Sequence, residues 1–359
     1  MRDGDLDSRT PATIAFYISG HGFGHAARAV ELIRTLLDAH PDLSLIVRTA
    51  VTPALFEPVA GTRVDVQPAE TDSGLTQRDS LNIDEEDSAR QAARFYADFD
   101  RRAGEEAAFL RAAEVDVVVG DIPPLAFAAA ARAGIPSVAV GNFTWDWIYG
   151  IYPAFAAFAP NVIPIIRDAY AQATRALRLP LHGGFAPMAA VTIDIPLIAR
   201  RSTRDREETR RAIGVDDSRP VVLPSFGAYG AALPYDIVRS DARLTVLDPA
   251  RVPGGFRYQD LVGAADVVLS KPGYGIVSEC VANGTPLLYT SRGRFIEYDV
   301  FVAEMPRILR CRYLSQEDLL AGRWADAVDA LLAQPAPPER ARIDGAGIAA
   351  GEILRMRTC

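Results

Sequence analysis

Apolar residues in this chain alternate between short continuous runs and stretches in which they recur every three or four positions. Runs such as Thr13 to Ile18 and Val115 to Gly120 are typical of parallel strands that are buried on both faces. After the first run, helical spacing indicates a helix whose apolar positions are Ala29, Leu32, Ile33, Leu36 and Leu37. The repeated order of strand and helix predicts an α/β protein with doubly wound parallel sheets.

The pattern divides the chain into two domains. We expect an N-terminal domain over residues 12–203, a second domain over 218–333, and a last helix within 339–359 that packs back on the first domain. The other predicted strands are 43–49, 62–67, 137–140, 221–224, 244–247 and 266–270. The other predicted helical stretches are 79–114, 204–213 and 343–356, and the segment 258–263 precedes the second glycine loop unit.

Each predicted domain begins with a strand that runs into a glycine-rich loop and then a helix. In open parallel sheets, ligands bind outside the carboxyl ends of the strands. We therefore expect two Rossmann-like domains that face each other across one cleft, with both glycine loops lining it.

The loop of the second domain lies between the strand at 266–270 and a short helix. Gly273 and Gly275 let backbone N–H groups approach an anion, and the helix N-terminus adds partial positive charge. Lys271, the only lysine of the chain, suits a phosphate, and Glu279 is placed to accept hydrogen bonds from sugar hydroxyls. The alternative is an ordinary strand-to-helix turn with a solvated Lys271.

The loop of the first domain, Ser19 to His25, reads Ser-Gly-His-Gly-Phe-Gly-His. It departs from the dinucleotide fingerprint because His25 occupies the place of the third glycine, and Arg48 and Thr49 replace the acidic residue after the second strand. A nicotinamide enzyme is therefore disfavoured. An imidazole at a helix entrance can accept a proton near neutral pH, and Asp121, at the end of a neighbouring strand, could orient His25. A metal-binding pair or a structural hydrogen-bonding pair remains open for the two histidines.

The densest polar and aromatic segment, Asn142 to Tyr149, follows the strand at 137–140. Its aromatic faces, together with Asn142 and Asp146, suit a sugar or a flat acceptor, and packing between the domains is an equally supported interpretation. Asp98 and Asp100 have D-x-D spacing, but they lie in a helical stretch, so we expect them to face water.

Composition narrows the function classes. The chain has 359 residues, 49% of them apolar and 23% charged, with a net charge of −8, which argues against a general nucleic-acid binder. The three cysteines lack metal-site spacing. The first eleven residues are polar, and no run of 18 apolar residues occurs, so we expect a cytoplasmic protein with no membrane-spanning segment. The apolar stretch 155–166 leaves peripheral membrane contact open, although burial is favoured.

At these residues the sequence resembles the nucleotide-sugar glycosyltransferases of the GT-B fold. Within that group it is most similar to the glycosyltransferase-like N-terminal region of plant L-arabinokinases. The likeness spans about residues 13–332 and is carried by the loop 19–26, Asn142 to Tyr149, Asp194 to Leu197 followed by Arg200 and Arg201, and Lys271 to Glu279. The segment 273–286 is also similar to bacterial cell-wall N-acetylglucosaminyltransferases and to natural-product glycosyltransferases.

The resemblance implies an acceptor-binding N-terminal domain and a C-terminal domain that binds a nucleoside diphosphate sugar as donor substrate, with no other cofactor and no metal. It makes His25 the base, Asp121 its orienting carboxylate and Glu279 the ribose-binding residue; we add His21 to the catalytic set. The expected donor-site residues are Gly22, Gly24, Phe226, Gly227, Lys271, Gly273, Tyr274, Gly275, Ser278, Glu279, Arg294 and Glu297. The segment 292–299 replaces the usual Asp-Gln pair of the family, so the donor sugar stays open.

The leading hypothesis is a metal-independent, inverting glycosyltransferase that acts on an acceptor hydroxyl of unknown identity. The alternatives are a nucleotide-sugar-binding regulatory module that does no chemistry and a nucleotide-sugar hydrolase. The sequence shows no glycine- and serine-rich phosphate loop of a sugar kinase, so kinase activity is not inferred.

Overall fold

The chain folds around two parallel β-sheets. The computed structural model describes residues 12–79, 81–215, 218–227 and 233–358. In the N-terminal domain, the strands are β1 Thr13–Ile18, β2 Ser44–Thr49, β3 Val64–Pro68, β4 Val117–Asp121, β5 Ser137–Gly141, β6 Arg175–Arg178 and β7 Thr192–Asp194. In the C-terminal domain, they are β8 Val221–Ser225, β9 Thr245–Val246, β10 Val267–Ser270, β11 Leu287–Tyr289 and β12 Cys311–Tyr313.

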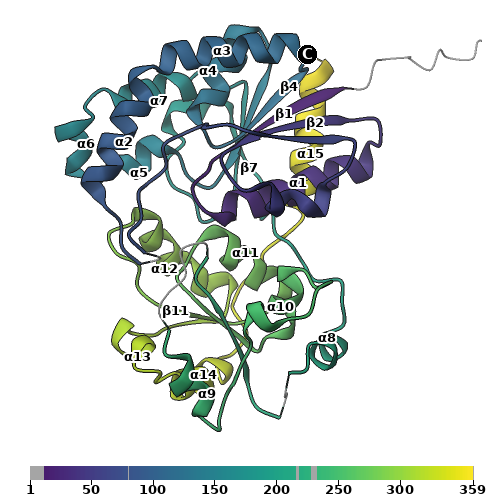
Figure 1. Ribbon diagram of the computed structural model, residues 1–359, viewed down its shortest axis with the longest axis vertical. Coiled ribbons are helices and arrows are strands. Elements are labelled where there is room, and N and C mark those ends of the chain that lie inside the picture. Colours follow the sequence, from purple (N-terminus) through teal and green to yellow (C-terminus); the bar gives the residue numbers. More distant parts are fainter. Residues whose placement is uncertain (1–11, 80, 216–217, 228–232, 359) are drawn as a thin grey trace, which may run out of the picture.

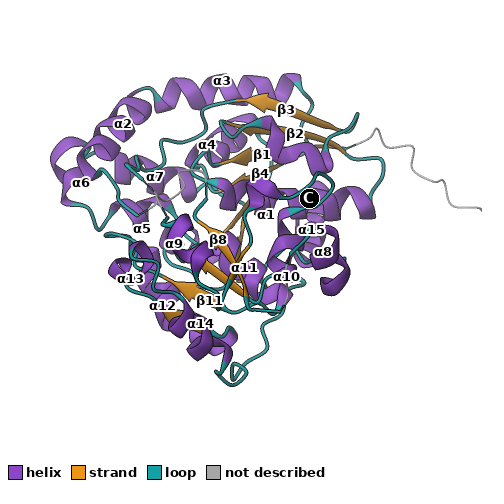
Figure 2. Ribbon diagram, turned by 60° about the horizontal axis from the view of Figure 1, so that its bottom comes forward, coloured by secondary structure: helices purple, strands orange, loops and turns teal. Residues whose placement is uncertain are grey.

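Helices cover both faces of each sheet (Figure 2). Those of the N-terminal domain are α1 Phe23–Ala39, α2 Glu85–Ala97, α3 Phe99–Ala112, α4 Pro124–Ala133, α5 Trp145–Tyr149, α6 Pro153–Phe158 and α7 Val162–Tyr170, with 3-10 helices at Pro53–Val59 and Ala186–Val191. Those of the C-terminal domain are α8 Arg206–Ala212, α9 Tyr235–Ser240, α10 Tyr258–Ala264, α11 Tyr274–Asn283, α12 Ile296–Ile308, α13 Gln316–Leu320 and α14 Ala325–Leu332, with a 3-10 helix at Pro249–Arg251. The chain ends with α15 Gly345–Arg355 and a 3-10 turn at Met356–Thr358.

The strand order places a crevice in each sheet. The first sheet has the order β3-β2-β1-β4-β5-β6-β7, so the chain reverses direction of winding between β1 and β4. The second has the order β12-β11-β10-β8-β9 and reverses between β8 and β10. Ile18 pairs with Asp121 and Ser270 pairs with Ser225, so both reversal points carry loops at the carboxyl ends of paired strands. The expected adjacency of the Asp121 strand and the first strand is therefore confirmed.

The chain crosses between the domains at two places that lie side by side. Around Leu197 it leaves the first domain, and around Asp344 it returns to it, so that α15 packs beside α1 (Figure 1). The Leu197 N–H donates to the Arg342 carbonyl at 3.1 Å, and the Gly345 N–H donates to the Leu197 carbonyl at 3.1 Å. The two crossings thus form one hydrogen-bonded hinge.

Buried apolar residues run from one domain into the other. The predicted apolar stripe of α1 is buried against the first sheet, and the same cluster continues through Tyr274, Val277 and Cys280 of α11 into the second. Within the described ranges, none of the helices combines the length and the apolar character needed to cross a bilayer. In the stretch 155–166, Phe155 and Ile166 are buried, whereas Phe158 is 39% exposed with Arg90 over its ring.

Two expectations change in the structure. The helical stretch predicted over 79–114 breaks at Asp98 into α2 and α3, and its first residues belong to a loop over 69–84 that crosses toward the C-terminal domain. In the aromatic segment 142–149, residues 145–149 form α5, and the full burial of Trp145 and Tyr149 favours packing for these two rings. Asp98 and Asp100 face solvent as expected, because their side chains are 60% and 92% exposed.

Candidate active site

Both glycine loops line one cavity of about 540 Å³ between the domains. The loop before α1 contributes His21 to His25, and the loop before α11 contributes Lys271 to Gly275. Of the expected donor-site residues, those that line the cavity are Gly22, Gly24, Phe226, Gly227, Lys271, Gly273, Tyr274, Gly275, Glu279 and Glu297. The sequence prediction of a glycine-bearing loop over 225–230 falls partly on residues 228–230, which lie outside the described residues. The volume is in the range of small-molecule sites.

Two helix N-termini meet at this cavity. Neither Gly22 before α1 nor Gly273 before α11 provides a side-chain cap, so the first N–H groups of both helices are free for a ligand. Gly22 has a φ of 84°, a left-handed conformation that favours glycine. A Cβ atom at Gly275 would come within 3.2 Å of the Gly24 Cα, which shows how closely the two backbones approach. The convergence of two partial positive charges suits an anion.

His25 is held by a buried carboxylate. Its Nδ1 lies 2.8 Å from Asp121 Oδ1, which assigns the proton to Nδ1 and the lone pair to Nε2, and the residue lines the cavity. Arg28, only 4% exposed, donates from Nε to Asp121 Oδ2 at 2.8 Å and from Nη2 to Oδ1. Burial alone would raise the pKa of Asp121, but Arg28 and then His25 hold it below its ordinary value, so the carboxylate stays charged.

His21 is engaged by the protein through both ring nitrogens. Nδ1 accepts from the Leu75 N–H at 3.2 Å, and Nε2 lies 3.2 Å from the side-chain amide of Gln77. Gln77 Oε1 has no partner in the assigned amide orientation, and turning the amide over lets that oxygen accept from Nε2–H. Burial, followed by the charge of Arg292, lowers the pKa of His21 well below its usual value. This arrangement fits a structural role better than proton transfer.

The donor side of the cavity is positively charged. Lys271 is half-buried, and burial followed by the charge of Arg292 lowers its pKa to about 7. Arg292 is 7% exposed and stacks over the Phe295 ring with its guanidinium carbon 3.8 Å from the ring centroid. Lys271, Arg292 and the N-terminus of α11 together place positive charge on this side of the cavity, which suits an anion.

Glu279 lies one turn into α11 and is buried. Arg200, from the first domain crossing, donates from Nε to Glu279 Oε1 at 2.7 Å. Burial raises the pKa of Glu279, and the charge of Arg200 offsets part of that rise. The pair joins the donor site to the hinge, and Oε2 is the oxygen that the guanidinium contacts leave for a ligand hydroxyl.

A buried polar contact also crosses the cleft. Asn142 Nδ2 donates to Glu297 Oε1 at 2.6 Å, and Asn142 Oδ1 accepts from Arg28 Nη1 at 3.0 Å. Asn142 is 1% exposed and Glu297 5%. The His25 and Asp121 pair is therefore linked through Arg28 and Asn142 to the first turn of α12 in the other domain.

Two expected donor-site residues do not line the cavity. Ser278 is buried and donates to the Gly275 carbonyl inside α11, and Arg294 points to the surface, where it donates to the Ile151 carbonyl. The cavity instead includes Arg28, Gln77, Asn142, Arg200 and Arg292. Arg28 lies three residues after His25 in α1, and this spacing places both side chains on one helix face. This spacing could have predicted Arg28 as a site residue from the sequence.

The two sides of the cavity suit different chemistry. His25 offers a proton acceptor on the N-terminal side, whereas the C-terminal side offers positive charge and backbone N–H groups. Among the described residues, no three His, Cys, Asp or Glu side chains gather closely enough to hold a metal ion.

Comparisons with known proteins were made by sequence and by structure. No protein-family model matches the chain. The chain is 31% identical over 328 residues to L-arabinokinase from Arabidopsis thaliana, and the match covers 86% of this chain and 31% of the relative. It is 27% identical over 227 residues to a UDP-N-acetylglucosamine–N-acetylmuramyl-(pentapeptide) pyrophosphoryl-undecaprenol N-acetylglucosamine transferase from Clavibacter sepedonicus, covering 55% of this chain and 57% of the relative. The chain thus spans about a third of the first relative and somewhat more than half of the second.

Solved structures give the fold. The kitacinnamycin glycotransferase superposes with a TM-score of 0.60 at 18% identity and covers 97% of this chain and 100% of its own. Phytolacca americana UGT2, solved with UDP-2-fluoro-glucose and pterostilbene, superposes with a TM-score of 0.58 at 14% identity, covering 97% and 94%. The expected fold of two facing Rossmann-like domains is confirmed by these full-length matches.

Proposed function

We propose that this glycosyltransferase-like chain of the GT-B fold transfers a sugar from a nucleoside diphosphate to a hydroxyl group of an acceptor. The observation that carries the proposal is the meeting of the two glycine loops at one cavity, which both His25 and Lys271 line. The similarity to an N-acetylglucosamine transferase, together with the UDP-2-fluoro-glucose held by UGT2, supports a nucleotide-sugar donor.

The reaction would begin with the acceptor in the N-terminal half of the cavity. His25 takes the proton of the attacking hydroxyl on Nε2, and the resulting imidazolium is stabilised by Asp121, which already accepts from Nδ1. Arg28 keeps that carboxylate ionised and in place. His25 therefore acts as general base and Asp121 as the group that orients it.

The leaving diphosphate would lie at the N-terminus of α11. Its developing charge is met by Lys271, Arg292 and the free N–H groups after Gly273. The ribose hydroxyls would reach Glu279. A single displacement inverts the anomeric configuration, and the positive charge supplied by the chain's own groups leads us to expect activity that does not depend on an added metal ion.

A panel of nucleoside diphosphate sugars tests the proposal. We would incubate the chain with UDP-, TDP-, GDP- and ADP-sugars, with and without a set of acceptor alcohols and phenols, and measure release of nucleoside diphosphate. Transfer predicts release that depends on the acceptor and a glycosylated product of inverted configuration by proton NMR. Release without any acceptor would instead identify a hydrolase, and saturable binding with no release would identify a sensing module.

A series of chelator concentrations tests separately whether transfer is independent of a metal ion. Transfer should proceed at an unchanged rate after treatment with EDTA. A rate that vanishes with EDTA and returns with magnesium or manganese would refute that part and leave sugar transfer itself standing.

A further inference from the structure

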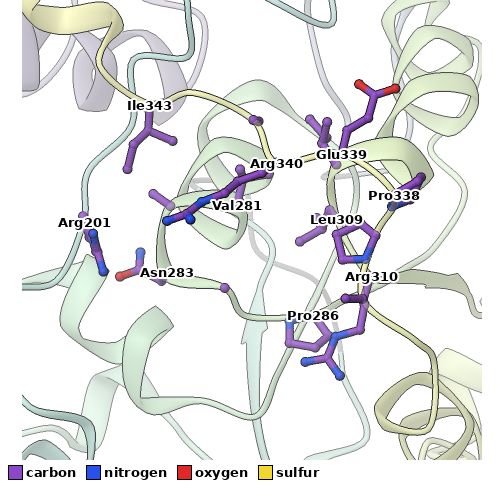
Figure 3. A pocket seen from close by; sticks show the side chains of 16 residues that line it. Arg201, Val281, Asn283, Pro286, Leu309, Arg310, Pro338, Glu339, Arg340 and Ile343 are labelled. Atoms are coloured by element: carbon purple, nitrogen blue, oxygen red, sulfur yellow. The ribbon is translucent and has the colours of Figure 1, made fainter.

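A second cavity, of about 560 Å³, lies at the far end of α11 from the proposed donor site. It is bounded by Arg201, by the end of α11 at Asn283, by Leu309 and Arg310, and by the returning segment 336–343; we call it the hinge pocket (Figure 3). α11 begins at the proposed donor site and ends in this pocket, so one helix of 10 residues separates the two cavities. None of the residues with proposed roles in transfer lines the hinge pocket.

The pocket lies where the two crossings between the domains diverge. Ile198 and Asp344 pair as an antiparallel bridge, and beyond it the two segments separate around the pocket. Arg201 comes from the outgoing crossing, and Arg340 and Ile343 come from the returning one. A ligand in the pocket would therefore contact both connections at once.

Asn283 fixes the backbone that presents Arg201. Its Oδ1 accepts from the Ser202 N–H at 2.9 Å, and its Nδ2 donates to the Arg200 carbonyl at 3.2 Å. The residues on both sides of Arg201 are thus held, while the Arg201 side chain is left to extend into the pocket (Figure 3). A backbone fixed before binding reduces the entropy lost when a ligand is held.

The pocket carries unpaired positive charge. In the described part of the chain, neither Arg201 nor Arg340 has a hydrogen bond or an ion pair. Arg310 makes a single 3.4 Å contact with the Leu332 carbonyl. The one acid at the pocket, Glu339, is already paired with Arg307 at 2.9 Å. This excess of positive charge occurs in a chain whose net charge is −8.

We propose that the hinge pocket is a second binding site, for a small molecule that carries a phosphate group. Guanidinium groups bind phosphate oxygens in a bidentate manner, and Figure 3 shows Arg201 and Arg340 on the same side of the pocket. Val281, Leu309 and Ile343 supply apolar surface for the organic part of the ligand. The site is independent of sugar transfer and would exist even if the cleft did no chemistry.

Inorganic pyrophosphate is the probe for the test, because it suits both cavities. We would titrate it calorimetrically into the whole chain at constant ionic strength. Two sites are expected in the wild type. The double variant Arg201→Gln with Arg340→Gln should weaken one of them by about tenfold or more, because each lost charged hydrogen bond is worth that much. Lys271→Met should remove the other site and leave the hinge pocket intact.

A matched control separates the effect of the two pocket arginines from the effect of a change in net charge. Arg94→Gln with Arg312→Gln makes the same change of charge at two exposed arginines that line neither cavity. This control should titrate like the wild type, and both double variants should unfold at the wild-type temperature because the altered side chains are exposed. The proposal is overturned if the hinge variant binds like the wild type, if the control loses the same site, or if Lys271→Met abolishes all binding.

Discussion

At the scale of single residues, the cleft is organised by one buried carboxylate that accepts hydrogen bonds from two side chains. Asp121 accepts from His25 and from Arg28, and all three side chains are less than a tenth exposed. A buried charge of this kind is stable only when it is paired and hydrogen-bonded. Because Arg28 supplies the pairing, Asp121 can orient His25 without requiring a charged imidazole, which leaves His25 free to accept a proton.

Replacing His25 by alanine tests the proposed base. Transfer to an acceptor should fall by roughly 10²- to 10⁴-fold, the usual contribution of general base catalysis. The affinity for the nucleoside diphosphate should change little, because the proposed donor contacts come from the other domain. Steady-state kinetics and calorimetry measure the two effects. His40→Ala is the control, since His40 is exposed at the opposite end of α1. Full activity of His25→Ala would refute the assignment.

The pH dependence of donor binding tests Lys271. Its pKa is lowered from about 10.5 to about 7 by burial and by Arg292, so the free protein loses the ammonium charge as the pH rises through 7. A diphosphate needs the charged form, and its own second ionisation, near pH 6, is complete by then. Affinity for UDP should therefore fall by up to about tenfold per pH unit between pH 7 and 8.5.

Lys271→Met supplies the comparison, because it removes the titrating group and keeps a side chain of similar length. Its affinity should be lower at pH 7 and should vary less with pH than that of the wild type. Calorimetric titrations with UDP at three pH values in one buffer measure how the affinity of each protein varies with pH. Parallel pH profiles in the two proteins would show that Lys271 does not contact the diphosphate.

At the scale of elements, the sequence predicted the strands, turns and helices that are determined by neighbouring residues. The glycines before α1 and α11 and the apolar strands around them mark both loops, because strand, turn and helix each follow from neighbouring residues. Arg28 was not predicted as a site residue, and Asn142 was weighed only as part of a segment that suits a sugar, since the contacts of both residues join elements 93 to 155 positions apart. Residues 79–84 of the loop 69–84 were predicted as helix, and the contact of this loop with the second domain is long-range.

The loop 69–84 also contributes contacts to the site, in addition to the two glycine loops. The Leu81 carbonyl accepts from the Gly293 N–H at 2.9 Å, so a loop of the first domain docks on the second beside Arg292. A Cβ atom at Gly74 would lie 3.1 Å from the His21 ring, so glycine permits the close passage of the loop over His21. No periodic pattern in residues 69–84 predicts these contacts, because they join residues that are far apart in the sequence.

The close contact between α1 and α11 gives a prediction for the place where these two helices meet. A Cβ atom at Gly275 would press to 3.2 Å on the Gly24 Cα, so Gly275→Ala should shift the two loops by a few tenths of an ångström. Gly275→Val should shift them further. We expect kcat/KM to fall by about tenfold and about a hundredfold, because small misplacements of reacting groups are costly.

Folding should be unaffected by these changes, since alanine is favoured over glycine in a helix. Thermal unfolding monitored by circular dichroism checks this point. Gly347→Ala, in a part of α15 where a Cβ atom meets open space, is the matched control for activity. Equal kcat/KM in Gly275→Val and the wild type would mean that the close approach of the two loops is not used in the reaction.

At the scale of the whole molecule, the domains are joined by the hinge and by several polar contacts, one of which lies inside the cleft. The hinge is the paired crossing at Leu197 and Asp344, and the cleft contact is the 2.6 Å hydrogen bond from Asn142 to Glu297. Apolar packing also continues from α1 into α11, so the two domains are in direct contact. The cleft contact is buried, and a change of charge can break it without altering an apolar residue of either domain core.

Asn142→Asp tests this idea, because the new carboxylate still accepts from Arg28 but repels Glu297. Two like charges at that distance in a buried site should separate the domains. We expect a larger radius of gyration by small-angle X-ray scattering and a donor affinity about tenfold weaker. Asn161→Asp makes the same change of charge at an exposed position of the first domain and should leave both measurements unchanged.

Adding Glu297→Gln to Asn142→Asp should reverse the opening, because the new amide can donate to the new carboxylate and so restores one hydrogen bond with its direction exchanged. Such rescue separates loss of the cross-domain bond from local damage around Arg28, which the second substitution cannot repair. If Asn142→Asp scatters like the wild type, or if the double variant stays as open as the single one, the contact between Asn142 and Glu297 does not hold the cleft closed.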